Sequence, residues 1–285
     1  YVDGSLTQQK PIYSRKNGFE HHHHWIGEGE NAPMKTLLEI SDLSLFYQTK
    51  TAEIKAVDNL SLTVSSGEFV AIIGRSGCGK TSILSVIAGL LPYEGKVSVS
   101  GKTIDSPGKN VGYMLQRDEL FEWLTIEENV YLPLKIRRQK RRKDMKENVE
   151  KLTEKYGLKD FMKRYPSELS GGMRQRAALI RTLVCDPELL LLDEPFSALD
   201  YQTRLAVCDD VYAIIKNEKK TAILVTHDIS EAISVADRIV ILSARPAKII
   251  AVHDMPFDKT LPPLRRRECP QFAGIFEKVW RDLNT

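Results

Sequence analysis

The sequence has no long apolar run, few cysteines and almost no net charge. None of its apolar stretches approaches the roughly twenty residues that a helix needs to cross a bilayer, so a membrane role would have to come through partner chains. Four cysteines are scattered over 285 residues without a CxxC pair, which favours a reducing compartment and argues against a structural zinc site. The formal net charge of +3 is too small to indicate nucleic-acid binding.

Internal repeats and heptads are also absent, but the character of the chain changes along its length. Residues 1–33 are polar, include four consecutive histidines and contain no apolar secretion signal, so we expect a disordered extension or an artificial leader. We expect the main domain at 34–245 and a short C-terminal extension at 246–285. Within the main domain, residues 37–110 resemble strands, about 118–176 are helical, and apolar strands alternate with helices thereafter. That alternation predicts a parallel sheet.

A glycine-rich segment, Gly74-Arg75-Ser76-Gly77-Cys78-Gly79-Lys80-Thr81, follows the apolar run 69–73 and precedes a helical pattern. This strand–loop–helix context is typical of a P-loop, whose backbone N–H groups surround phosphates at a helix N-terminus. Lys80 would bridge the β- and γ-phosphates of ATP, and the Thr81 hydroxyl would hold Mg²⁺. Modification of the Cys78 thiol is expected to block nucleotide binding. The nucleotide-binding candidates here are Gly74, Arg75, Ser76, Gly77, Cys78, Gly79, Lys80, Thr81 and Ser82.

A second apolar strand, 189–192, ends in the acidic pair Asp193 and Glu194. Carboxylates at the carboxyl end of a buried parallel strand lie where open α/β sheets bind ligands. We expect Asp193 to hold Mg²⁺ directly or through water, and Glu194 to polarise the attacking water as a general base. An acidic surface turn would be the simpler interpretation if the P-loop were missing.

A second glycine-rich segment, Leu169-Ser170-Gly171-Gly172-Met173, opens a helix whose amino end has no acidic residue. Such an end attracts an anion through its unpaired N–H groups. An ordinary helix cap by Ser170 is the alternative.

In order along the chain, these motifs resemble those of the nucleotide-binding subunit of ATP-binding-cassette (ABC) transporters, over roughly residues 37 to 245. The P-loop is followed by a Q-loop match at Gln116, the signature 169–173, the Walker B strand ending at Asp193 and Glu194, a D-loop match at 197–200 and a switch-histidine match at His227. The resemblance implies an α/β fold: a P-loop NTPase core with a mainly parallel sheet and flanking helices, an antiparallel β subdomain and an α-helical subdomain.

The resemblance also implies roles for residues that composition alone leaves open. Gln116 would sense Mg²⁺ and the γ-phosphate, His227 would contact the γ-phosphate and steady Glu194, and Tyr47 would stack on adenine, although the adjacent Phe46 offers a second ring. Two copies would pack head to tail, so that Ser170, Gly171 and Gly172 of one copy cap the ATP bound to the other. The implied cofactors are ATP and Mg²⁺.

The implied partners are a second copy of the chain, transmembrane permease subunits and, indirectly, a solute-binding protein, with no nucleic acid. The chain would then lie on the cytoplasmic face of the cell membrane. Phe121 and Trp123 would anchor a permease helix, although core burial is an alternative for one of them. The basic run 135–143 is interpreted first as a solvated helix face and second as a contact with anionic lipid. Nucleic-acid binding ranks third because no aromatic residues are interleaved.

Several segments are similar to the nitrate/sulfonate/taurine importer subgroup, among them 169–176 and 242–246. Two positions depart from that subgroup: the pair Arg117-Asp118, which follows Gln116, and Lys248. These departures weaken the inference about the solute and leave the ATP chemistry intact. The resulting prediction is an ATP-hydrolysing subunit that energises a bacterial importer of a small anionic solute. An exporter subunit, or an importer subunit for another small solute such as a vitamin precursor, remains the alternative.

Overall fold

The structure is a computed structural model that describes residues 35–137 and 143–284. Residues Met34–Thr285 form one compact unit. The expectations for 1–33 and for the central part of the basic run, 138–142, fall outside the described residues.

The larger of two sheets has six strands, and all neighbouring pairs are parallel except β9 with β10. Its three central strands are buried along their whole length, as the continuous apolar runs in their sequences predict for a sheet covered on both faces. In spatial order the strands are β10 (Ile249–Asp254), β9 (Arg238–Leu242), β3 (Phe69–Ile73), β8 (Thr221–Thr226), β7 (Leu189–Asp193) and β6 (Val111–Met114).

The smaller sheet is antiparallel and has four strands. In β2 buried and exposed residues alternate from Leu60 to Val64, so that one face packs inward, whereas β1 has buried runs of two and three residues and several register shifts. In spatial order the strands are β2 (Glu53–Ser65), β1 (Thr36–Gln48), β4 (Glu94–Val99) and β5 (Lys102–Thr103).

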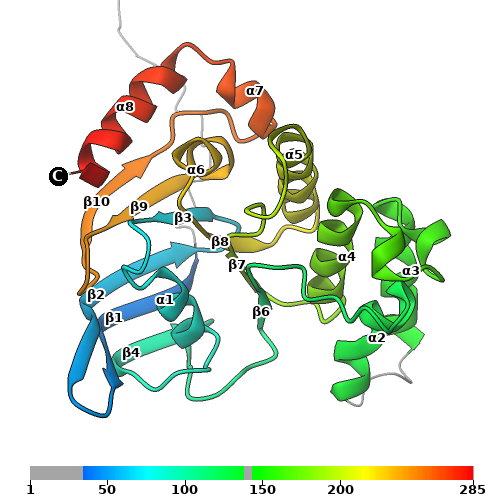
Figure 1. Cartoon of the computed structure of the whole chain (residues 1–285), viewed down its shortest axis with the longest axis horizontal. Coiled ribbons are helices and arrows are strands. Elements are labelled where there is room, and N and C mark those ends of the chain that lie inside the picture. The colour runs from blue at the N-terminus through cyan, green and yellow to red at the C-terminus, as the bar shows by residue number, and fades with distance from the viewer. Residues whose placement is uncertain (1–34, 138–142, 285) are drawn as a thin grey trace, which may run out of the picture. The chain divides into compact units, whose positions relative to one another are not determined.

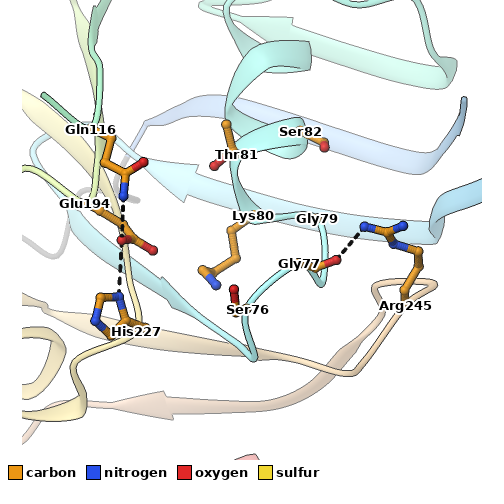
Figure 2. A pocket seen from close by; sticks show the side chains of 10 residues that line it. All are labelled: Ser76, Gly77, Gly79, Lys80, Thr81, Ser82, Gln116, Glu194, His227 and Arg245. Carbon is orange, nitrogen blue, oxygen red and sulfur yellow. Dashed lines mark hydrogen bonds and ion pairs between the residues drawn. The ribbon is translucent and has the colours of Figure 1, made fainter. Parts of the chain in front are cut away.

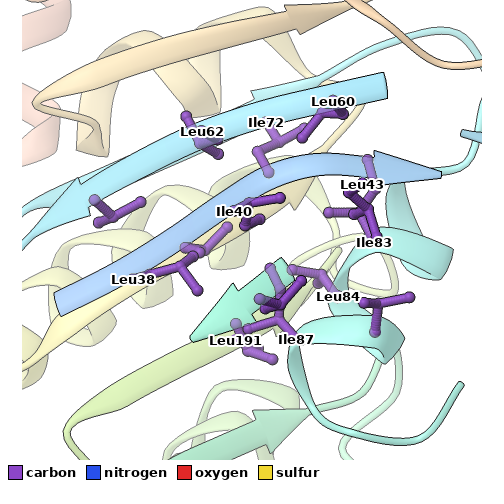
Figure 3. Close-up of a cluster of buried hydrophobic side chains, with 14 of the residues drawn as sticks. Leu38, Ile40, Leu43, Leu60, Leu62, Ile72, Ile83, Leu84, Ile87 and Leu191 are labelled. Carbon is purple, nitrogen blue, oxygen red and sulfur yellow. The ribbon is translucent and has the colours of Figure 1, made fainter. Parts of the chain in front are cut away.

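The two sheets and helix α1 (Lys80–Ile87) share one apolar core, part of which is drawn in Figure 3. Val70 and Ile72 of β3 face this core, whereas Ala71 and Ile73 pack on the opposite side against α6 (Ile229–Val235) and α8 (Gln271–Asn284). This two-residue alternation covers both faces of the central strand.

Helices α5 and α7 lie on the same side of the larger sheet as α6 and α8 (Figure 1). Helices α2 and α3 lie beside α4 and form a separate helical group. Helices α4 and α5 pack against β6, β7 and β8, and α2 packs against α4 in the same apolar cluster. The bounds are α2 (Ile126–Ile136), α3 (Lys143–Lys155), the 3₁₀ turns η1 (Lys159–Phe161) and η2 (Pro166–Glu168), α4 (Gly171–Leu183), α5 (Tyr201–Asn217) and α7 (Pro263–Arg267).

The expected fold class is confirmed: a mainly parallel sheet with flanking helices and an antiparallel β subdomain. The expected domain boundaries stay predictions. In the described residues, no helix is both long enough and apolar enough to span a membrane.

The C-terminal extension is attached to the core by a buried arginine. Arg266 is 1% exposed, and its guanidinium donates to the carbonyls of Ala236 and Leu261, each at 3.1 Å, and to the hydroxyl of Tyr212. The guanidinium carbon also lies 4.9 Å from the centre of the Tyr212 ring, a cation–π contact. Because the group is desolvated, each of these bonds has to be present in the folded state.

Replacing this arginine should therefore destabilise the protein. We expect Arg266→Ala to lower the free energy of unfolding by about 3 kcal/mol, because it removes charge-assisted bonds and leaves the groups around them without donors. Urea unfolding measures the difference. Arg265→Ala is the control: its side chain is 66% exposed and pairs only with Glu268, so we expect a loss below about 0.5 kcal/mol. Equal losses for the two variants would contradict this role of Arg266.

Candidate functional site

Four parallel strands end at the same edge of the larger sheet, and each leads into a segment that carries a candidate residue. β3 runs into the P-loop, β7 ends at Asp193 and Glu194, β8 is followed by His227, and β6 by Gln116. A cavity of about 540 Å³ opens there, as Figure 2 shows. Its lining residues are Ser76, Gly77, Gly79, Lys80, Thr81, Ser82, Gln116, Glu194, His227 and Arg245.

The P-loop takes a backbone path that its glycines permit. Gly77 and Gly79 have φ values of 73° and 120°, which L side chains rarely adopt. A Cβ on Gly79 would also lie 3.2 Å from the carbonyl oxygen of Ala56. The loop leads into α1, whose first turn has no acidic residue and no side-chain cap, so its N–H groups remain for a phosphate.

Two P-loop side chains differ sharply in direction. Lys80 is 6% exposed and donates to the carbonyls of Gly74 and Arg75, at 2.8 and 3.2 Å, while still lining the cavity. Cys78 is 2% exposed, packs in the apolar core and does not line the cavity. The thiol is therefore shielded in the folded protein, and the expectation that its modification blocks nucleotide binding stays a prediction.

Asp193 lies under the cavity between two hydroxyl groups. Thr81 Oγ1 donates to Asp193 Oδ1 and the Tyr113 hydroxyl donates to Asp193 Oδ2, both at 3.2 Å. Burial raises the pKa of Asp193, and the bonds from Thr81 and Tyr113 oppose that rise. Burial and the neighbouring Asp193 charge raise the pKa of Tyr113 to about 12, so the phenol stays protonated and can donate.

Glu194 is the acidic residue next to the cavity, and one of its oxygens has two neighbours. Gln116 Nε2 donates to Glu194 Oε2 at 3.2 Å, and His227 Nδ1 lies 3.2 Å from the same oxygen. The Glu194 backbone has φ of 46°, unusual for a residue with a Cβ, and is held there by bonds to Val225 and Ser197. The three side chains converge from β6, β7 and β8 (Figure 2).

The segment behind His227 is fixed by polar side chains. Thr226 Oγ1 donates to the buried carboxylate of Glu231 at 2.7 Å, and Asp228 caps α6 by accepting from the N–H groups of Ser230 and Glu231. Burial raises the pKa of Glu231. The His227 side chain itself is 60% exposed, so a ligand can reach it from the cavity.

The second glycine-rich segment does not line this cavity. Ser170 is exposed and caps α4, its Oγ accepting from the N–H of Met173 at 3.4 Å. Gly171 is exposed and Gly172 is buried; a Cβ on either would lie 2.8 Å from a neighbouring side chain, Leu199 or Val207 respectively. Within one copy, therefore, Ser170, Gly171 and Gly172 are not brought to the P-loop.

Tyr47 lies beside the P-loop helix. Its hydroxyl is 2.8 Å from Ser82 Oγ, and its ring is 38% exposed. The neighbouring Phe46 is engaged differently, with the Lys55 ammonium 5.2 Å from its ring centre. Tyr47 is thus the ring of the two that is tied to the glycine-rich loop.

Comparison with known proteins places this geometry in a family. The ABC transporter family profile matches residues 57–197. YtlC of Bacillus subtilis, named an uncharacterised ABC transporter ATP-binding protein, is 44% identical over 252 residues, which cover 88% of this chain and 96% of YtlC. The chain belongs to the ABC transporter ATP-binding proteins. This confirms the family resemblance and, at the level of the family, the expected ATPase class.

Two further matches show which other ABC proteins this one is similar to. The aliphatic sulfonates import ATP-binding protein SsuB of B. subtilis is 42% identical over 224 residues, covering 78% of this chain and 85% of SsuB. A dimeric structure of the ATP-binding cassette MJ0796 in a post-hydrolysis state, bound to ADP and Pi, aligns with a TM-score of 0.65 and 27% identity. It covers 78% of this chain and 100% of that chain.

Two residues of the ABC cassette's site were not found from the sequence. Tyr113 contacts Asp193 across 80 residues of chain, and Arg245 reaches Gly77 across 168 residues. Tyr113 precedes Gln116 in the same strand-end segment, which was the available signal for it. Arg245 lies in the family-like segment 242–246, but nothing in that segment indicated that the tertiary structure brings it to the P-loop.

The contact between Tyr113 and Asp193 leads to a pH prediction. Because the Tyr113 bond lowers the pKa of Asp193, Tyr113→Phe should raise that pKa further. If turnover requires ionised Asp193, the acid side of the pH–rate profile for ATP hydrolysis should move to higher pH in the variant. Tyr93→Phe is the control, since the Tyr93 hydroxyl donates to the Ile104 carbonyl and does not contact Asp193. Superimposable profiles for wild type and Tyr113→Phe would contradict this coupling.

Proposed function

We propose that the chain is the ATP-hydrolysing subunit of an ABC importer for a small anionic solute such as a sulfonate. The observation that carries the proposal is the convergence of Gln116 and His227 on one carboxylate oxygen of Glu194, at the cavity that the P-loop lines. The similarity to SsuB, an aliphatic sulfonates import ATP-binding protein, supports the importer and the solute class.

In the proposed reaction, the P-loop N–H groups and Lys80 bind the phosphates, with the γ-phosphate nearest Glu194. The bound nucleotide presents its γ-phosphorus at the cavity, and a water lies in line with it. Glu194 accepts a proton from this water as the water attacks the γ-phosphorus and ADP leaves. Gln116 and His227 orient the Glu194 carboxylate, and the exposed edge of His227 is free to contact the γ-phosphate. Gln116 Nε2 and His227 Nδ1 both lie 3.2 Å from Glu194 Oε2, which leaves Glu194 Oε1 for the water.

The site also suits Mg²⁺. Thr81, Asp193 and Gln116 offer hydroxyl, carboxylate and amide oxygens, the donor types that Mg²⁺ prefers. No group of three or more acidic, histidine or cysteine side chains with metal-ligand geometry occurs in the described residues. Phosphate oxygens and water would therefore have to complete the coordination, as is usual for Mg²⁺ at a nucleotide. Bound there, the ion would neutralise charge that develops on the phosphates.

A second copy of the chain is the proposed source of Ser170, Gly171 and Gly172 for the γ-phosphate. In one copy these residues lie at an exposed, acid-free helix start away from the cavity. Head-to-tail pairing would bring that start to the partner's P-loop and would remove water from both nucleotides. The dimeric structures of the MJ0796 cassette support the pairing of two copies.

A groove of about 390 Å³ is the proposed contact with a permease subunit at the cytoplasmic face of the membrane. Its lining residues are Leu115, Glu119, Phe121, Leu132, Pro133, Ile136, Arg137 and Arg181. Trp123, 72% exposed, lies with its ring centre 5.0 Å from that of Phe121. Asn129 fixes the loop that carries both rings: its side chain accepts from the N–H of Phe121 and donates to nearby carbonyls. A rigid aromatic pair beside an apolar groove is suited to anchoring a partner helix.

The carboxylate of Glu194 provides the direct test of the proposed function. We expect Glu194→Gln to reduce ATP turnover at least about a hundredfold, because an amide cannot accept the water's proton, while ATP-dependent dimers accumulate in size-exclusion chromatography. Glu188→Gln, at the opposite end of the same strand, should retain activity. Full turnover by Glu194→Gln would rule out its role as the base.

Substitution of Ser170 tests the contribution of a second copy. Ser170→Arg should bind nucleotide like the wild type yet fail to dimerise, since a bulky cation would occupy the helix start that caps the partner's nucleotide. Lys80→Ala should weaken nucleotide binding itself, and Ser66→Arg, in the turn before β3 at the opposite edge of the sheet, should change neither property. Calorimetry with ATP measures nucleotide binding, and light scattering with ATP measures dimerisation. Identical behaviour of Ser170→Arg and Lys80→Ala would overturn this division of roles.

A further inference from the structure

The turn between β9 and β10, residues 243–248, brings a second cation to the P-loop. Arg245 lines the same cavity as Lys80, and one of its terminal nitrogens donates to the carbonyl of Gly77 at 2.7 Å. In Figure 2 Arg245 lies at the end of the cavity opposite Gln116, Glu194 and His227. The two ends of the cavity therefore differ in chemistry: one carries the carboxylate and its neighbours, the other a guanidinium.

The turn that carries Arg245 is held from two sides. Ser243 closes it from within, its Oγ donating to the carbonyl of Pro246 at 3.0 Å and accepting from the N–H of Lys248 at 3.0 Å. Ala247 attaches it to the antiparallel sheet through backbone bonds with Ala56 and Asp58. Because the backbone of this turn is already held in place, binding a ligand through Arg245 costs little conformational entropy in the turn.

The charge on Arg245 is not neutralised by the protein. No carboxylate in the described part of the chain forms an ion pair with it, and its hydrogen bond to Gly77 occupies one of five donors. Among the ten lining residues Glu194 is the acidic one, and it belongs to the other end. An anion that enters this end of the cavity meets the Arg245 guanidinium and no acidic side chain among the lining residues.

We propose that Arg245 binds the α-phosphate of the nucleotide, as a second cation beside Lys80. The inference rests on the proposed function, which places the γ-phosphate next to Glu194 and so directs the other phosphates toward the Arg245 end. The α-phosphate keeps its charge while the bond between the γ-phosphorus and the bridging oxygen breaks, so a contact to it stabilises the bound ground state and the transition state equally. Arg245 therefore sets nucleotide affinity and leaves the chemical step nearly unchanged.

A purely structural role for Arg245 makes a different prediction. If the guanidinium only braced the Gly77 carbonyl, its loss would disturb the P-loop and lower kcat, and a lysine would replace it poorly. If it binds phosphate by its charge, a lysine retains part of the effect. The ratio of affinities for ATP and ADP adds a further distinction, because the two nucleotides share the α- and β-phosphates and differ at the γ-phosphate.

The experiment compares Arg245→Gln and Arg245→Lys with the wild type in the full chain. Calorimetric titration uses ADP and the non-hydrolysable analogue adenylyl-imidodiphosphate, and steady-state kinetics uses ATP with Mg²⁺. We expect Arg245→Gln to weaken both nucleotides by about tenfold, with their affinity ratio unchanged, and to raise KM about tenfold with kcat within about twofold. Arg245→Lys should lose less affinity than Arg245→Gln. Lys248→Gln, in the same turn but outside the cavity and paired with Asp58, should match the wild type.

Other results would overturn the inference. These are unchanged nucleotide affinity in Arg245→Gln, a loss confined to the triphosphate analogue, a fall in kcat at unchanged affinity, or equal losses in Arg245→Gln and Arg245→Lys. A wild-type chain that binds neither nucleotide would overturn the proposed function as well, so the two failures are told apart by the wild-type titration alone.

Discussion

The parallel pairing of β6, β7, β8 and β3 is the constraint on which the site depends. Parallel strands present all their carboxyl ends at one edge, so residues separated by more than a hundred positions in the chain meet around one cavity. The apolar runs in these strands make the pairing strong, since their burial on both faces drives the sheet together. The polar residues at and after the strand ends are thereby brought together at this edge without needing any affinity for one another.

Burial and hydrogen bonding together determine the character of the two acidic residues at this edge. Asp193 lies beneath the cavity, where desolvation raises its pKa and the hydroxyls of Thr81 and Tyr113 oppose that rise. Glu194 comes one residue later on a strained backbone, which turns its carboxylate into the cavity toward Gln116 and His227. Adjacent carboxylates thereby receive different surroundings, one suited to a metal and the other to a water.

The antiparallel sheet and the C-terminal extension contribute more than cover to the nucleotide site. The turn 243–248 connects β9 of the large sheet to β10, while its backbone is bonded to β2 of the small sheet and its Arg245 to the P-loop. Arg266 attaches α7 to the core through the Tyr212 hydroxyl and the Ala236 carbonyl. The turn thus touches the loop that would bind phosphate, while Arg266 holds α7 against α5 and the segment after α6.

The sequence by itself determined the fold class, the family and the segments of the site, because the P-loop, the strand ending in Asp193-Glu194 and the signature helix start are local patterns with fixed spacing. It also led to Gln116 and His227, through the order of family motifs. Only the tertiary structure decided how these side chains are oriented: that Cys78 turns into the core, that Gln116 and His227 share one oxygen of Glu194, and that Tyr113 contacts Asp193. Arg245 is the extreme case, since its contact with Gly77 spans 168 residues and depends on where two sheets hold a turn. Local patterns record the geometry of a loop or a helix start, whereas contacts of this range arise from packing, which no short stretch of sequence encodes.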